Sequence, residues 1–180
     1  MHRCSHVSLM ADYNRWMNEN VYAVAATLPP AALVLDRHAF FGSILDTLNH
    51  LVAADTIWLQ RFATLAAHAV ALDAVRRRPA PTGLAQILFA DFATLRVQRA
   101  ELDAIIIAWA GTISAADLDG QLAYANTRGV AAQRNVFSLL MHFFNHQTHH
   151  RGQVTTLLSQ AGVDVGMTDL LALIPSGHAP

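Results

Sequence analysis

Apolar residues recur every three or four positions along four long stretches of the chain, which is the spacing of one face of an α-helix. The first stretch runs from about His6 to Leu28 and is ended by Pro29 and Pro30. The second begins after Gly42, and its apolar face carries a single acidic residue, Asp55. Ser43 is a suitable N-cap for it, because a serine hydroxyl accepts a hydrogen bond from an unpaired N–H of the first turn.

The third and fourth stretches are bounded by similar signals. An arginine- and proline-rich loop at 76–81 precedes Thr82, which is the expected cap of a third helix that ends at Gly111. Its apolar face comprises Leu84, Leu88, Phe92, Leu95, Leu102, Ile105 and Trp109. Asn135 is the expected cap of a fourth helix that continues through Leu158 and closes at Gly162.

Two segments outside these stretches follow other patterns. Residues 117–134, which contain Gly120 and Gly129, lose the helical spacing and predict a short hairpin or an ordered loop. A short last helix is expected near Asp169 to Ile174. Four long helices without a series of strands predict an all-α four-helix bundle formed by one domain over residues 1–180, and such bundles commonly build metal sites between facing helices.

Composition narrows the functional classes. The chain has no lysine, and its 12 basic residues stand against 13 acidic ones, for a net charge of -1. A nucleic-acid partner is not expected, because the chain offers no basic excess to a phosphate backbone. Cys4 is the only cysteine, so any metal must rely on nitrogen and oxygen ligands.

The N-terminal residues also bear on location. They include Tyr13, Asn14, Arg15 and Asn18 where a signal peptide would need an apolar run, and no stretch of the chain is apolar enough to span a bilayer. We therefore expect a cytoplasmic protein without a membrane partner.

The chemistry-bearing residues concentrate in the fourth predicted helix. His142, His146, His149 and His150 lie within nine residues, and side chains three or four apart share one helical face. Neutral imidazole is a common ligand of zinc, nickel, copper and iron. The spacing alone does not choose among the pairs His142/His146, His146/His149 and His146/His150, and a third ligand must come from elsewhere.

His50 is the candidate third ligand, since it is the only histidine outside that helix which lies well inside a predicted helix; His2 and His178 fall in the expected tails. By helical angle it sits on the flank of the apolar face, which fits a partly exposed residue or a groove site. Asp46, one turn earlier, is a candidate to orient the imidazole by accepting its second N–H, although a plain surface carboxylate is the simpler interpretation.

Two familiar metal motifs are missing. The chain has no HExxH motif, which argues against the helical zinc proteases. Glu19 and Glu101 are its only glutamates, and neither precedes a histidine by three, so a di-iron carboxylate site is not expected.

Three segments give the chain a resemblance to a known family. They are Tyr13-Asn14-Arg15-Trp16-Met17-Asn18, then Leu48-Asn49-His50-Leu51 with Asp55 and Trp58, and Asn145-His146-Gln147-Thr148-His149-His150-Arg151-Gly152-Gln153. Together they resemble the DinB/YfiT-like metalloenzymes, which are distinct from the DNA polymerase that shares part of the name. The last segment is the most specific.

The resemblance implies a four-helix bundle that holds one metal ion through His50, His146 and His150, with His142 and His149 outside the ligand set. Similar proteins often form homodimers and carry zinc or nickel, and some are transferases or isomerases that use a small cellular thiol. Arg151, Tyr124 and Asn145 are candidates for contacts with substrate or with the ligands, and for each a structural role is the competing interpretation. Trp16, Trp58 and Trp109 are expected to be core or dimer-interface residues.

These observations favour a divalent-metal protein, and within that class a metal-dependent enzyme acting on small molecules, such as a thiol-dependent S-transferase or isomerase. Three histidine ligands leave a coordination position open, as in catalytic metal sites. The alternatives are a non-catalytic metal-binding or stress-response protein, and a metal-dependent hydrolase.

Overall fold

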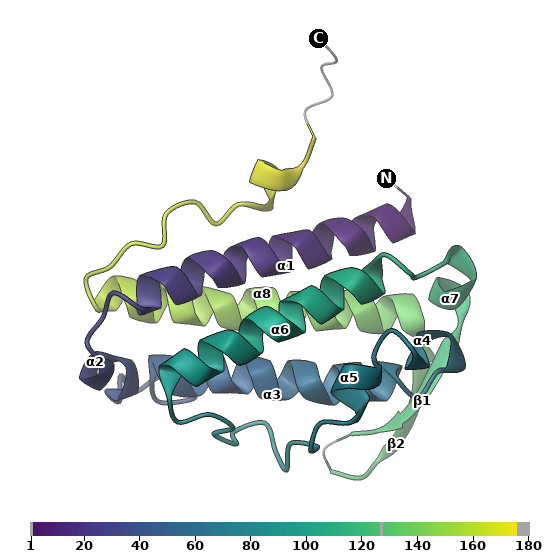
Figure 1. Cartoon of the computed structure of the whole chain (residues 1–180), viewed down its shortest axis with the longest axis horizontal. Coiled ribbons are helices and arrows are strands. Elements are labelled where there is room, and N and C mark those ends of the chain that lie inside the picture. Colours follow the sequence, from purple (N-terminus) through teal and green to yellow (C-terminus); the bar gives the residue numbers. More distant parts are fainter. Residues whose placement is uncertain (1, 127, 176–180) are drawn as a thin grey trace.

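Four long helices lie side by side along the length of the molecule (Figure 1). They are α1 (Arg3–Ala25), α3 (Ile44–Phe62), α6 (Phe92–Ala110) and α8 (Val136–Gln160). The computed structural model describes residues 2–126 and 128–175. Helix α1 packs on α6 and α8, and α3 packs on the same two helices, so the four form a closed bundle. The predicted all-α four-helix bundle is confirmed.

The direction of each helix follows from the residues that meet. His50 and Trp58 of α3 face His146 and His142 of α8, so these two helices are antiparallel. Phe62 at the end of α3 packs on Trp109 at the end of α6, so that pair is parallel. A parallel neighbour requires the chain to return along the bundle. The connection between α3 and α6 does so, and it contains α4 (Ala66–Ala69) and α5 (Asp73–Arg76).

Side-chain caps define three of the helix starts. The Ser43 hydroxyl accepts from the Asp46 N–H at 3.1 Å, and the Asn135 side chain accepts from the Ser138 N–H at 3.0 Å, as the sequence predicted. The third cap was predicted wrongly. Helix α6 begins at Phe92 with Asp91 as its cap, and not after Thr82.

Leu84 and Leu88 therefore lie in an irregular loop and not on the third helix. The reason is a set of long-range hydrogen bonds from Asn49 of α3, whose Oδ1 accepts from the N–H groups of Leu88 and Phe89, each at 2.9 Å. Its Nδ2 donates to the Phe89 carbonyl at 3.0 Å. These bonds satisfy backbone groups that a helix would otherwise pair, and they hold the loop against α3.

The segment before α8 is a hairpin, one of the two forms predicted for it. Strand β1 (Gln121–Ala125) pairs antiparallel with β2 (Ala131–Asn135), and Tyr124 faces Ala132 across the ladder. The short helix α7 (Ala115–Asp119) precedes it, and α2 (Pro30–Val34) follows α1. The expected last helix is a 3-10 turn, η1 (Leu170–Leu173). His178 lies outside the described residues.

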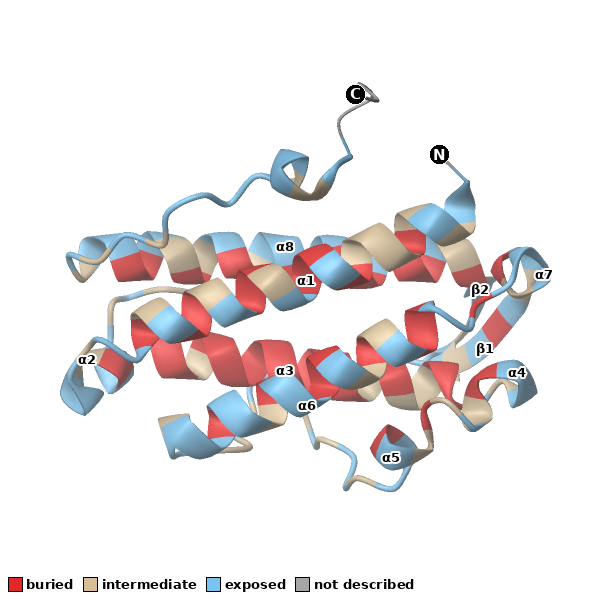
Figure 2. Cartoon of the chain, turned by 45° about the horizontal axis from the view of Figure 1, so that its top comes forward, coloured by how far each residue is buried: buried red, intermediate tan, exposed pale blue. Residues whose placement is uncertain are grey.

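The inward faces of the four helices form the core (Figure 2). Asp55 and Arg99 are among the buried polar residues, and Arg99 Nη1 donates to Asp55 Oδ2 at 2.5 Å. Arg99 Nη2 also lies 2.9 Å from Asp103 Oδ1. Asn14 and Asn18 of α1 donate to Asp103, and Gln147 of α8 donates to Asp55. This buried network links all four long helices at mid-bundle.

Among the described residues, no helix is both long enough and apolar enough to cross a membrane.

Candidate metal centre

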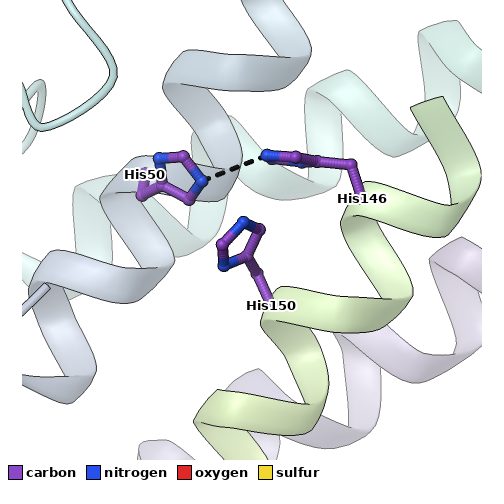
Figure 3. A group of neighbouring side chains, drawn as sticks. All are labelled: His50, His146 and His150. Carbon is purple, nitrogen blue, oxygen red and sulfur yellow. Dashed lines mark hydrogen bonds between the residues drawn. The ribbon is translucent and has the colours of Figure 1, made fainter. Parts of the chain in front are cut away.

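Three histidines from two helices, α3 and α8, point toward one another (Figure 3). His50 comes from α3, and His146 and His150 lie one turn apart on α8. Nε2 of His50 is 3.2 Å from Nε2 of His146, and one ring nitrogen from each of the three lies within 4.8 Å of the others. Within the described part of the chain, this is the one group of its kind.

The His50 ring is oriented by the loop before α6. Its Nδ1 lies 2.8 Å from the carbonyl oxygen of Leu84. Because a carbonyl can only accept, Nδ1 carries the proton and Nε2 presents its lone pair toward His146. The Leu84 carbonyl, and not the candidate Asp46, accepts from this imidazole, which leaves the simpler interpretation of Asp46 as a plain surface carboxylate.

Of the two interpretations of His50 that its helical angle allowed, a partly exposed residue is excluded, because its exposed fraction is 3%. The loop that carries Leu84 covers it from one side, held there by Asn49. Phe41 covers it from another side and stacks on the imidazole with ring centroids 3.9 Å apart and planes 20° apart. Phe41 also contacts His150 edge-on at 5.6 Å. No pattern in the sequence pointed to Phe41, which lies in the turn before α3.

His150 is oriented from within its own helix. Its Nδ1 lies 2.7 Å from Oε1 of Gln153, three residues later, so Nδ1 donates and Nε2 stays available as a ligand atom. The ring centroids of His146 and His150 are 4.4 Å apart, as expected for residues four apart on one helical face. Two of the three rings thus have a fixed second hydrogen bond, which is the usual arrangement around metal-ligating histidines.

The electrostatics favour neutral rings. Burial lowers the pKa of His50 to about 4 and that of His146 to about 3. The pKa of His150 is also lowered, again first by burial. Since a ligating nitrogen must be unprotonated, the three imidazoles stand ready to bind a cation at neutral pH without first losing a proton.

The spacing of the donor atoms suits a first-row metal. Zinc–nitrogen bonds of about 2.0–2.1 Å in a tetrahedral site place two ligand nitrogens about 3.3 Å apart. The His50–His146 separation of 3.2 Å agrees with this value. The three histidines could therefore hold a metal ion with small adjustment of the His150 ring.

The other two histidines of α8 do not join this group. The His142 ring packs edge-on against Trp58, with centroids 5.1 Å apart. His149 is exposed, and its ring lies on the outer side of His150. The structure thus separates the three pairings that the sequence spacing left open, and it brings together the pair His146/His150.

The remaining candidate residues have different surroundings. Arg151 is buried, donates to Asn14 in the core and lies over the Tyr13 ring at 5.5 Å, which supports the structural interpretation. Asn145 is exposed on α8. Tyr124 lies on β1 and packs on Trp58 with ring centroids 5.3 Å apart.

The buried network reaches the site through Gln147. This residue follows His146 directly, and its amide donates to Asp55 at 2.8 Å. The contact fixes the rotation of α8 against α3 beside the histidines. The sequence marked Asp55 only as an acidic residue on an apolar face, because its partners come from other helices.

Comparison with known proteins agrees with this architecture. The chain is 25% identical to Protein DinB of Bacillus subtilis (strain 168) over 165 residues, which cover 88% of this chain and 87% of that protein. No solved structure matches the chain significantly. The model of the DinB family matches residues 2–177, which include all three histidines. By this match over nearly its whole length, the chain belongs to the DinB family.

Proposed function

We propose that His50, His146 and His150 bind one divalent metal ion, with zinc or nickel as the expected metals. The observation that carries the proposal is the convergence of three ring nitrogens within 4.8 Å of one another, from rings that burial keeps neutral. Imidazole nitrogen suits both metals, so the ligand set does not distinguish them. Identification of the chain as a DinB-family member supports the same interpretation.

The ligand count favours a catalytic role over a purely structural one. Structural zinc sites usually close their coordination with four protein ligands, whereas catalytic sites keep a position open. Among the described residues, the group of potential ligands has three members. When bound, an ion in such a site favours the deprotonated form of a small thiol or of water, which yields a nucleophile near neutral pH.

We further propose that the reaction is a thiol-dependent S-transfer or isomerisation of a small molecule. This step relies on the resemblance described above. The sequence has no HExxH motif, so the glutamate that serves as general base in helical zinc proteases is missing from its expected place. The protein contributes positioning and exclusion of water. Phe41 and the loop at Leu84 cover His50, and the Leu84 carbonyl and Gln153 hold the ligand rings in place.

The setting proposed for this activity follows from the same arguments. We expect a cytoplasmic homodimer that acts on small molecules and not on nucleic acid, because a chain with net charge -1 gives phosphate backbones no general attraction. Two alternatives make different predictions: a non-catalytic metal-binding or stress-response protein, and a metal-dependent hydrolase.

An activity screen on the metal-loaded chain separates these functions. Purified protein is incubated with low-molecular-weight thiols and a panel of small electrophiles, and thioether products are followed by mass spectrometry. His50→Ala tests dependence on the site, and His149→Ala on the same helix is the matched control. Product formation that requires thiol, metal and His50 supports the transferase. Turnover without thiol indicates a hydrolase, and a loaded chain with neither activity indicates a binding protein.

A further inference from the structure

A separate cavity of about 420 Å³ opens at the end of the molecule that carries the hairpin. Its walls come from the second half of α3, from the loop at 80–83 and from strand β1. The lining residues include Ile57, Pro81 and Tyr124. The volume is within the range of small-molecule sites, and Arg61 is the one charged residue of the lining.

Arg61 is held in place without a counter-ion. Its guanidinium lies over the Trp58 ring at 4.6 Å and over the Tyr124 ring at 5.0 Å. Its Nη2 donates to the Ala125 carbonyl at 2.9 Å. Nine ion pairs form within the part of the chain that the structure describes, and Arg61 takes part in none of them. A half-buried arginine oriented by two aromatic rings, with N–H groups to spare, suits recognition of an external anion.

The cavity is close to the histidine group along two paths. On α3, Ile57 lies two turns after His50, which is about 10 Å along the helix. On the loop, Gly83 of the cavity wall directly precedes Leu84, whose carbonyl orients His50. Aromatic rings fill the space between them. Ring centroids are 6.1 Å apart for His146 and His142, 5.1 Å for His142 and Trp58, and 5.3 Å for Trp58 and Tyr124.

We propose that this cavity binds a small molecule bearing a carboxylate, with the guanidinium of Arg61 as the anion-recognising group. The apolar part of the ligand packs against Ile57, Pro81 and the Tyr124 ring. The inference deepens the proposed function by naming a carboxylate as the substrate class, and it rests on that function only in taking the ligand for a substrate.

The test is calorimetric titration of the full chain with 4-phenylbutyrate, which joins a carboxylate to an aromatic ring. Its neutral counterpart, 4-phenylbutyramide, has the same shape without the charge. Arg61→Gln removes the cation, Arg61→Lys keeps the charge but loses the planar fork, and Arg134→Gln is the control, since Arg134 is exposed on the same hairpin outside the cavity. Each titration is run on zinc-loaded and on chelator-treated protein.

We expect the carboxylate to bind wild type and Arg134→Gln equally. The carboxylate should bind Arg61→Gln about tenfold or more weakly than wild type, and Arg61→Lys should be intermediate. The amide should bind wild type about as weakly as the carboxylate binds Arg61→Gln. Equal binding of acid and amide to wild type, no binding of either, or unchanged affinity in Arg61→Gln would overturn the inference. The acid–amide comparison needs no variant, so it stands even if a variant misfolds. Titrations on chelator-treated protein test the carboxylate site independently of metal. If the chain binds no metal, only the proposed function fails.

Discussion

Replacement of Asp55 tests how far the buried network stabilises the bundle. The Asp55 side chain is fully buried, and it accepts hydrogen bonds from Arg99 at 2.5 Å and from Gln147 at 2.8 Å. Asp55→Asn keeps the volume but removes the negative charge.

The magnitude follows from what Arg99 retains. Removing one partner of a buried ion pair typically costs about 3–5 kcal/mol, because the other charge stays buried without compensation. Arg99 still has Asp103 at 2.9 Å, so we expect the lower end of that range, about 3 kcal/mol. The matched control is Asp119→Asn, which breaks an exposed pair with Arg3 at 2.8 Å and should have little effect on stability, because solvent screens exposed ion pairs.

The assay is urea unfolding of chelator-treated protein, followed by circular dichroism, with the free energy of unfolding extrapolated to water. We expect the Asp55 variant to lose several times more free energy of unfolding than the Asp119 variant. The slope of that free energy against urea concentration should be unchanged. If the two variants lost the same amount, or if Asp55→Asn lost less than about 1 kcal/mol, the buried pair would not be a main determinant of stability.

Three further predictions concern the surroundings of the site. Asn49→Ala should release the loop at Leu84, speed amide exchange at Leu88 and weaken metal binding about tenfold, as loss of ligand-orienting contacts usually does; unchanged exchange would contradict this. Metal affinity should stay constant from pH 8 to pH 6, because the pKa of His50 is lowered to about 4. Below pH about 6.5 the histidines of the unfolded chain bind protons, whereas the buried rings of the folded chain stay neutral. The free energy of unfolding of chelator-treated protein should therefore fall as the pH drops from about 6.5 toward 4, and no dependence on pH would argue against buried neutral rings. Gly42→Ala should lower the melting temperature, since Gly42 has φ +80°, whereas Gly152→Ala should raise it, because an added Cβ meets nothing within 4 Å there and a glycine inside a helix is replaced; shifts of the same sign would refute the comparison.

The sequence was most informative where local chemistry decides the structure. Ser43 and Asn135 cap their helices as predicted, because a cap needs only a side-chain acceptor and the next turn of backbone. The third helix shows the opposite case. The apolar spacing extends back to Leu84. However, the side chain of Asn49, which is distant in sequence, accepts hydrogen bonds from the backbone N–H groups of Leu88 and Phe89. A local signal for the true start was present in Asp91, whose side chain caps at Thr94.

The candidate metal site also combines features that local sequence predicts with features that depend on distant residues. The spacing of three or four residues predicted a chelating pair but allowed three choices, and in the structure the packing of His142 on Trp58 and the exposure of His149 separate them. Burial of His50 could not be read from its helical angle, because its cover comes from Phe41 and the Leu84 loop. Arg99 is buried for a similar reason, since its partners Asp55 and Asp103 meet only after α3 and α6 pack.

Metal content per chain tests the central claim most directly. Purified protein is loaded with zinc or nickel, freed of excess ion and analysed by mass spectrometry for metal, alongside single alanine variants of His50, His146 and His150 and of the controls His142 and His149. The account predicts about one ion per chain in wild type and both controls, and strongly reduced content in the three ligand variants. A wild type that retains no metal, or a His50→Ala variant that retains as much as wild type, would contradict it.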